Sequence, residues 1–321
     1  MNMSKFKFKR EPLTPELKLL YKKRTTHIVV NFVRYFFLLA LSYVVLYQLF
    51  FMISYSIRPK MDLYNPSVVW IPTSVTFEHF ENAFNQLFYL KTGFVSLWLM
   101  EVSAFIEVIV CSVIAYGFAR FEFKEKNAIF FLVLITIIVP VQMLIIPMYI
   151  NYSHFDIMGI GKFLIDTFNL PDFRPSIVNT GLTFWLPSLF GVGVRSGLFI
   201  FIYRKFFEGL PRELEEAAYV DGAGPLRTFI SVILPSSGVV FLTVTIFSTI
   251  WHWNESYMAG MYNQLNPPLA VQLENIKTTI LRESRQAGMA ACMLFILPML
   301  VMYAILQRKF VQSIDRVGIV G

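Results

Sequence analysis

The chain has 321 residues, of which 56% are hydrophobic and 15% are charged, and it carries 33 phenylalanines and a formal net charge of +7. A soluble domain has about a quarter of its residues charged, so this composition excludes an ordinary soluble globular protein. The positive charge does not indicate nucleic-acid binding, because the basic residues gather between apolar runs, as they do in membrane proteins.

Apolar runs long enough to cross a bilayer recur along the chain. A helix needs about 20 residues to span a hydrocarbon core of about 30 Å. We therefore predict an all-α polytopic membrane protein with about six transmembrane helices. The predicted spans cover residues 34–57, 94–118, 128–152, 182–205, 237–258 and 288–307.

The distribution of Lys and Arg predicts the orientation of these spans. Nineteen of the 28 basic residues fall in segments that share a side with the N-terminus, and eight fall on the opposite side. The positive-inside rule then places three segments in the cytoplasm: an N-terminal tail (1–33), a loop (206–236) and a C-terminal tail (308–321).

The cytoplasmic loop contains a polar, glycine-rich stretch, EEAAYVDGAGPLRTFISVILP, at residues 215–235. Pro211 suits the first turn of a helix, and Gly222 and Gly224 suit its end, because glycine adopts positive φ without penalty. Pro225 can begin a second helix. The pattern predicts a short helix–turn–helix at the membrane surface.

The first of these helices presents small residues beside a carboxylate. Ala217 and Ala218 leave a flat patch that a groove on another protein can approach, and Glu216 offers a negative charge next to it. Glu215 is expected on the polar side of the helix, away from the apolar stripe. The alternative interpretation is an amphipathic helix that only rests on lipid headgroups.

The order Glu216-Ala217-Ala218, three residues, Gly222, nine residues and then VILP (232–235) resembles the EAA loop of ABC-importer permeases. The longer form EAAYVDGAG is similar to the carbohydrate branch, specifically its maltose-type, MalG-like permeases. Several other blocks agree in order, so the resemblance covers nearly the whole chain after the N-terminal tail: WIP (70–72), TFEHF (76–80), AYGFARFEFK (115–124), PVQMLIIPMY (140–149), WHWNESYM (251–258) and QRKFVQS (307–313).

The resemblance implies a type I importer permease in a bacterial cytoplasmic membrane, with a coupling helix that docks in a cleft of an ATPase subunit. The implied coupling residues are Glu216, Ala217, Ala218, Asp221 and Gly222, with Asp221 capping or stiffening the turn. The implied partners are two ATPase subunits that bind the ATP, a second, MalF-like permease and an external solute-binding protein that delivers a carbohydrate. The outer loop at 162–181 is longer than the family pattern, and the tail reads FVQS where the family has FVQG.

Two ionisable residues fall inside predicted spans, where charges are costly and usually paired or functional. Glu107 lies thirteen residues before Arg120, and Arg195 lies nine before Arg204, so their depths differ by roughly 6 Å at 1.5 Å per residue. We predict an ion pair between Glu107 and Arg195. A water-lined position on the solute path is the alternative for each.

Aromatic and polar residues gather in the outer half of the fifth predicted span. Aromatic faces stack on the C–H faces of a sugar, while carboxylates and amides bond its hydroxyls. The predicted solute path comprises Glu101, Trp251, Trp253, Asn254, Glu255 and Tyr257. An interfacial aromatic belt is the alternative.

Catalytic and cofactor motifs are not recognisable in the sequence. It contains no P-loop pattern, no nucleophile motif and no His/Cys cluster with metal-ligand spacing. The chain is therefore expected to be neither an enzyme nor a cofactor binder. The alternatives left open are an ABC importer of a non-sugar solute, an ion-coupled transporter using Glu101, Glu107 and Glu255, and a membrane-embedded enzyme using the same carboxylates.

Overall fold

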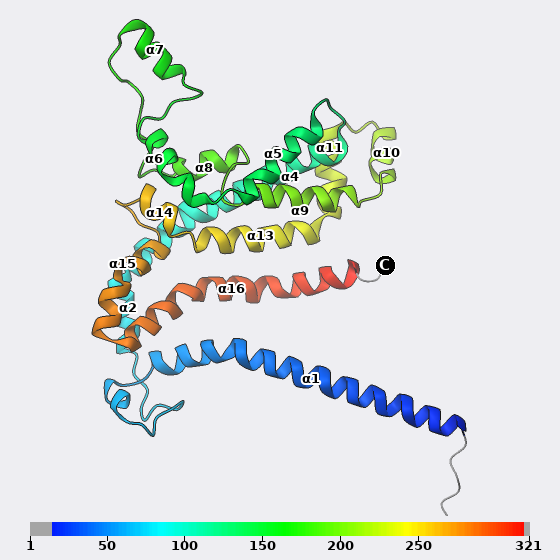
Figure 1. Ribbon diagram of the computed structural model, residues 1–321, viewed down its shortest axis with the longest axis vertical. Coiled ribbons are helices and arrows are strands. Elements are labelled where there is room, and N and C mark those ends of the chain that lie inside the picture. The colour runs from blue at the N-terminus through cyan, green and yellow to red at the C-terminus, as the bar shows by residue number, and fades with distance from the viewer. Residues whose placement is uncertain (1–14, 318–321) are drawn as a thin grey trace, which may run out of the picture.

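The protein is built from helices, as its composition predicted. The computed structural model describes the backbone of residues 15–317, and the side chains of 23–277, 280 and 284–308, so the outer parts of both predicted tails lie outside the described residues. No strand occurs between residues 15 and 317 (Figure 1). The helices are α1 (Pro15–Ser56), α2 (Glu78–Leu87), α3 (Tyr89–Val95), α4 (Val102–Arg120), α5 (Lys126–Ile138), α6 (Ile145–Ser153), α7 (Ile160–Phe168), α8 (Leu182–Leu189), α9 (Ser196–Glu208), α10 (Glu213–Val220), α11 (Pro225–Thr228), α12 (Leu234–Ser236), α13 (Gly238–Trp253), α14 (Tyr257–Tyr262), α15 (Leu269–Glu283) and α16 (Arg285–Val317).

Within the described part of the chain, three helical stretches are long and apolar enough to cross a membrane. They are Lys23–Ser56 in α1, Tyr89–Arg120 through α3 and α4, and Arg285–Arg308 in α16. A π-helical segment, Ser96–Glu101, joins α3 to α4 without a break. A fourth candidate is a helix pair bent by 82°, Pro225–Ser236 with Gly238–Trp253.

The third predicted span, 128–152, is not one helix. It consists of α5 and α6, separated at Val139 and Pro140. Proline has no N–H to donate and disfavours the helical conformation of the preceding residue. Val139 accordingly adopts extended backbone, with φ of −64° and ψ of 121°.

The fourth predicted span, 182–205, is also divided into two helices, α8 and α9. The connecting residues contain two glycines, and Gly191 and Arg195 have φ values of +69° and +65°. These left-handed conformations end one helix and start another. Arg195 therefore precedes α9 instead of lying inside a helix, as the sequence analysis had assumed.

The other predicted boundaries shift by smaller amounts. The fifth predicted span reached residue 258, but α13 ends at Trp253, with Asn254 as its C-cap. Residues 15–33 of the predicted N-terminal tail are part of α1, and α16 continues from 307 to Val317. Leu and Lys in residues 15–33, and Arg, Lys and Gln in residues 308–317, are good helix formers.

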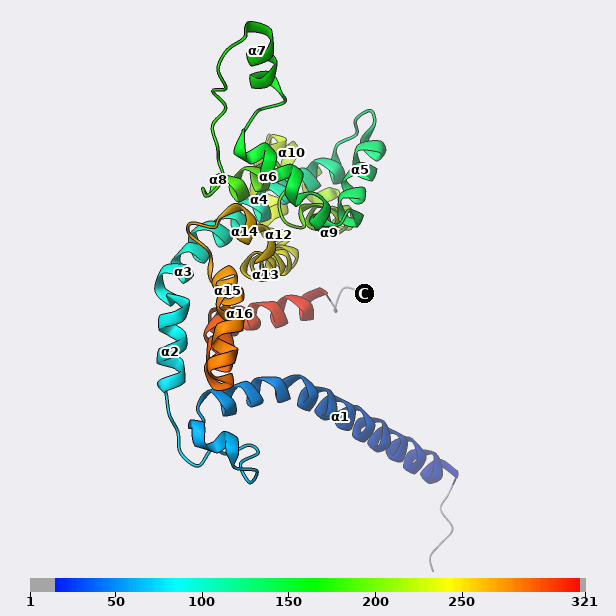
Figure 2. The same cartoon turned by 60° about the vertical axis from the view of Figure 1, so that its left-hand side comes forward.

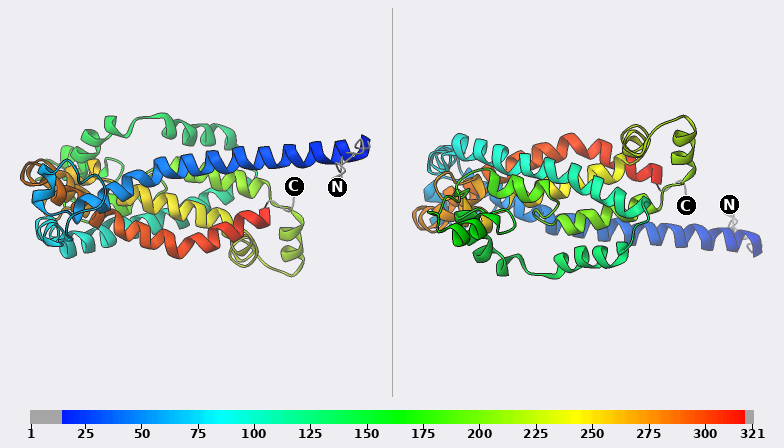
Figure 3. Two further views of the ribbon diagram at one scale, coloured as in Figure 1. Left: turned by 90° about the horizontal axis from the view of Figure 1, so that it is seen from below. Right: turned by 90° about the horizontal axis from the view of Figure 1, so that it is seen from above.

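Different helices lie at the two ends of the elongated molecule. The start of α1, the end of α16 and helix α10 lie at one end, whereas α2 and α15 lie at the other (Figure 3). Helix α4 packs against α8, α9 and α13 between these ends. Helix α1 contacts mainly α16, and α7 stands apart from the other helices (Figure 2).

Candidate functional site

The predicted helix–turn–helix is present at the α10 end of the molecule. Helix α10 ends in two backbone hydrogen bonds, from Gly222 N–H to Tyr219 O at 3.0 Å and from Ala223 N–H to Ala218 O at 2.9 Å. Gly222 has a φ of +81°, so this is a Schellman turn with glycine at its left-handed position. Asp221 is the C-cap residue.

The outward face of α10 is free for a partner. Glu216, Ala217 and Asp221 are exposed, Ala218 is half-buried, and no hydrogen bond or ion pair of the Glu216 side chain is formed within the described residues. The structure thus presents the predicted coupling residues together on one accessible segment.

Glu215, predicted to face away from the apolar stripe, is instead buried. Its carboxylate lies 2.5 Å from Nε of Arg120 at the end of α4, and the hydroxyl of Tyr116 donates to it at 3.4 Å. The sequence analysis missed this anchoring residue. The charge of Arg120 at the inner end of the second predicted span was a possible signal, because the sequence analysis had assigned no partner to this arginine.

Glu208 at the end of α9 is fixed by two basic neighbours. Arg204 lies 2.7 Å and Lys205 2.9 Å from its two carboxylate oxygens. Partial burial acts to raise the pKa of Glu208, but the hydrogen bond and charge of Lys205 and the charge of Arg204 hold that pKa below its usual value. Glu208 thus offsets one of the two positive charges at the entry to the loop.

A second polar cluster lies within the membrane-spanning region, around Glu107 on α4. Glu107 is completely buried. It accepts hydrogen bonds from Ser196 at the start of α9 and, at 3.2 Å, from Ser248 on α13. His252, one turn beyond Ser248, places Nδ1 3.7 Å from the same carboxylate. Glu107 therefore joins three helices.

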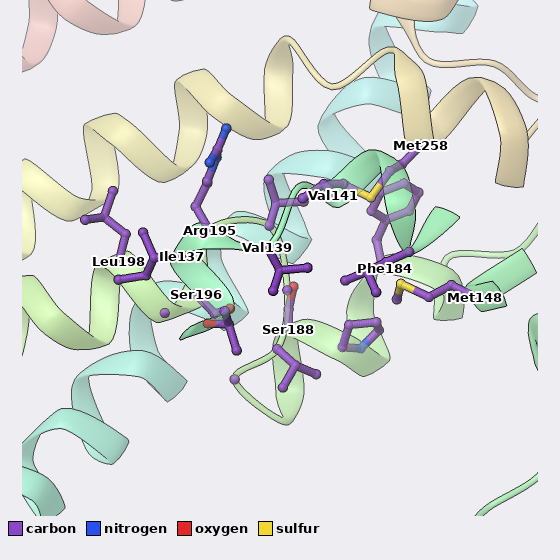
Figure 4. A pocket seen from close by; sticks show the side chains of 18 of the residues that line it. Ile137, Val139, Val141, Met148, Phe184, Ser188, Arg195, Ser196, Leu198 and Met258 are labelled. Carbon is purple, nitrogen blue, oxygen red and sulfur yellow. The ribbon is translucent and has the colours of Figure 1, made fainter. Parts of the chain in front are cut away.

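The predicted ion pair between Glu107 and Arg195 is not formed. Because Arg195 lies in the left-handed turn before α9, its side chain is directed toward α13, and its guanidinium lies 5.8 Å from the ring centre of Trp251 (Figure 4). The next residue, Ser196, faces Glu107 instead. Hydroxyl and imidazole groups take the place that the sequence analysis had given to a cation.

A cavity of about 450 Å³ lies between the two interrupted spans. Its walls come from both helix breaks, with Val139 and Val141 on one side and residues 191–198 on the other (Figure 4). Most of the lining is apolar, and the polar side chains include Thr136, Ser188 and Ser196. Such a cavity suits an amphipathic solute better than a bare ion.

The residues predicted to form a solute path are divided among different environments. Trp251 is half-buried between Phe199 and Phe247, and Glu101 faces Thr249 on α13. Asn254 and Tyr257 are exposed beyond α13, and the carboxylate of Glu255 accepts the N–H of Met258 at 2.8 Å. None of these side chains lines the 450 Å³ cavity.

Trp253 belongs to the packed core and not to an open path. Its side chain is buried among α2, α15 and α16, and its indole N–H donates to Phe295 O at 3.1 Å. Trp251 and Trp253, two residues apart on a helix, necessarily point in different directions. The sequence analysis assigned both to the solute path, whereas the structure buries Trp253 in the core.

Comparison with known proteins agrees with this architecture. Residues 108–316 match the family model described as binding-protein-dependent transport system inner membrane component. The chain is 23% identical over 304 residues to the arabinooligosaccharides transport system permease protein AraQ of Halalkalibacterium halodurans, covering 93% of this chain and 100% of AraQ. It is 27% identical over 259 residues to the diacetylchitobiose uptake system permease protein NgcG of Streptomyces coelicolor, covering 77% of this chain and 75% of NgcG.

The fold is also similar to a solved one. A chain in the crystal structure of a bacterial ABC transporter involved in the import of the acidic polysaccharide alginate aligns with a TM-score of 0.66 and 18% identity, over 89% of this chain and 98% of that chain. The predicted resemblance to ABC-importer permeases is thereby confirmed. Since the family model spans well over half of its length, the chain belongs to the binding-protein-dependent transport system inner membrane components, the permeases of ABC importers.

Proposed function

We propose that this chain is one of two permease subunits of an ABC importer that carries a carbohydrate, in particular an oligosaccharide. The observation that carries the proposal is the exposed segment Glu216–Gly222, held at one end of a membrane-spanning helical bundle. The names of the relatives AraQ and NgcG, which refer to arabinooligosaccharides and diacetylchitobiose, support the carbohydrate class.

The proposed complex contains two ATPase subunits, a second, MalF-like permease and an external binding protein. ATP is bound by the ATPase subunits, and this chain supplies no catalytic residue or cofactor. The segment Glu216–Gly222 docks in a cleft of one ATPase subunit, so that closure of the ATPases on ATP moves α10. The permease pair then alternates between inward- and outward-facing states around a path near the bilayer midplane.

We further propose that the complex lies in the bacterial cytoplasmic membrane with both termini and α10 in the cytoplasm. The excess of Lys and Arg on that side supports this orientation. The start of α1 and the end of α16 also lie at the same end of the molecule as α10. The 450 Å³ cavity, with Arg195 in its lining, is part of the proposed solute path. Trp251 on α13 is included because its ring lies 5.8 Å from the Arg195 guanidinium. Glu101, which immediately precedes α4, remains part of the proposed path.

The first test is purification of the tagged chain from its native membranes in mild detergent, followed by mass spectrometry. We expect an ATPase and a second permease to co-purify, and reconstituted complex to take up labelled oligosaccharides when the binding protein and ATP are present. Reproducible recovery of the folded chain alone, with uptake driven by an ion gradient, would contradict the proposal.

The second test uses two substitutions in the docking segment. Glu216→Lys reverses the exposed charge, and Gly222→Trp places a large side chain at a positive-φ position. Both variants are expected to insert in the membrane and to lose coupling between ATP hydrolysis and uptake. Glu122→Lys, a charge reversal at an exposed residue of the loop between α4 and α5, serves as the control that keeps coupling. Normal uptake by both docking variants would refute the coupling role.

A further inference from the structure

The contact between α4 and α10 is a buried ion pair. Arg120, the last residue of α4, and Glu215, in the first turn of α10, have side chains that are 6% and 8% exposed. The pair of Lys60 with Glu78 is, by contrast, largely exposed, and exposed pairs of that kind contribute little to stability. Removing one partner of a buried pair destabilises a protein far more, because it leaves an uncompensated charge in the interior.

Arg120 binds two parts of the loop at once. Its Nε faces the Glu215 carboxylate at 2.5 Å, and its Nη2 donates to the carbonyl of Leu210 at 2.9 Å. One side chain thus makes a directed hydrogen bond to Leu210 and a charge contact with Glu215. Helix α10 and the turn that leads into it are therefore held to the end of α4.

Tyr116, one turn earlier on α4, extends this attachment to the second half of the loop. Its hydroxyl donates to the other Glu215 oxygen at 3.4 Å, and its ring lies 4.9 Å from that of Phe229 and 6.1 Å from that of Phe207. All three aromatic side chains are buried. Both arms of the loop are thus packed on the same two turns of α4.

Helix α4 connects this attachment to the interior cluster. Glu107 lies thirteen residues before Arg120, about 20 Å along the helix at 1.5 Å per residue, and there it bonds Ser196 of α9 and Ser248 of α13. No helix break separates the two positions. A rigid-body displacement of the inner end of α4 would therefore move Glu107 and its contacts with α9 and α13.

We infer that the Glu215–Arg120 pair is the joint through which movement of α10 is passed to α4. This inference rests on the proposed function and assigns neighbouring glutamates different tasks. Glu216 is exposed toward the ATPase, whereas Glu215 points inward and acts as a positioning residue. The ATPase needs no direct contact with Glu215.

The test uses the complete reconstituted transporter with its partner subunits and measures uptake and ATP hydrolysis in the same vesicles. Arg120→Gln and Glu215→Gln are each expected to lower the uptake per ATP hydrolysed at least fivefold. The double variant Arg120→Glu/Glu215→Arg is expected to recover more of this ratio than either single variant has. Glu213→Gln, at an exposed residue of the same helix, is the matched control with a normal ratio.

A merely structural role would reduce the amount of assembled complex and leave the ratio unchanged, and that outcome overturns the inference. If the single variants do not assemble, Tyr116→Phe and Arg120→Lys provide milder changes. We expect each to lower the uptake per ATP hydrolysed about twofold. A wild-type ratio in both variants would contradict the inferred role of the Glu215–Arg120 pair. Failure of the unmodified complex to couple ATP hydrolysis to uptake would instead count against the proposed function.

Discussion

Ser196, the first residue of α9, donates its hydroxyl to Glu107 on α4, 89 positions earlier in the chain. The same carboxylate accepts from Ser248 on α13. A buried carboxylate with two hydroxyl donors and a neighbouring imidazole avoids the cost of an unpaired polar group inside the membrane. The bundle around the cavity is therefore held by one acceptor that three helices share.

The first prediction concerns this acceptor. Glu107→Ala leaves the buried hydroxyl of Ser196 without its acceptor, leaves Ser248 only the longer contacts to Ala104 O and His252 Nδ1 at 3.4 Å, and opens a void. We expect this to destabilise the subunit by about 2–5 kcal/mol. Glu107→Gln keeps the shape of the side chain and one acceptor oxygen, so the loss of stability should be much smaller. The thermal midpoint of each purified variant complex measures these losses. Equal midpoints for the two variants would mean that the hydrogen bonds do not stabilise the bundle.

The second prediction concerns the close approach of α9 to α5. A Cβ on Gly197 would lie 3.0 Å from the carbonyl oxygen of Val133 and would also overlap the hydroxyl of Thr136. Gly197→Ala should therefore cost about 1–3 kcal/mol of stability. Gly117→Ala on α4 is the control, because nothing lies within 4 Å of its Cβ position; there we expect no loss. A stable Gly197→Ala complex would show that α5 can move away from α9 without penalty.

The third prediction separates two glycines of the docking loop. Gly222 has a φ of +81°, so Gly222→Ala should strain the turn by about 1–2 kcal/mol, although open space surrounds it. Gly224 has a φ of −79°, which alanine adopts freely. We expect uptake by reconstituted vesicles to fall for Gly222→Ala and to remain normal for Gly224→Ala. The reverse order of effects would contradict a left-handed turn at Gly222.

The fourth prediction concerns the two aromatic residues that flank the end of α13. Trp253 is 3% exposed, and Trp253→Ala should destabilise the subunit by about 3–5 kcal/mol. Tyr257 is 65% exposed, so Tyr257→Ala should leave the thermal midpoint unchanged. Trp253→Phe retains most of the packing and should also retain uptake. Lost uptake by a stable Trp253→Phe variant would restore this tryptophan to the solute path.

The sequence predicted the features that depend on composition and local pattern. Gly222 ends α10 because glycine adopts this positive φ without a steric penalty, and that preference is visible in the sequence. The break at Pro140 was equally readable from its missing N–H, but the apolar run around it was interpreted as one span. Hydropathy alone does not distinguish a continuous helix from two helices joined end to end.

The partners of buried charges could not be predicted in the same way. The pairing of Glu107 with Arg195 was inferred from depth along two ideal helices. Arg195 itself adopts the left-handed conformation before α9, and its side chain is therefore directed toward α13. Glu215 was placed on a polar face because helical spacing describes only one helix. Its burial depends on the approach of α4, which only the tertiary structure contains.

The two helix breaks beside the cavity have a consequence for mutagenesis. Non-helical backbone at membrane depth is tolerated where it is enclosed by protein or lines a cavity, and residues 139–141 and 191–195 bring such backbone to the cavity wall. If the proposed carbohydrate path runs through this cavity, peptide groups there that are not already hydrogen-bonded would meet the hydroxyls of the sugar. Alanine scanning removes side chains and leaves peptide groups in place, so it would underestimate how much this wall contributes to recognition. Replacing individual amides by esters would reveal contacts that no side-chain substitution reports.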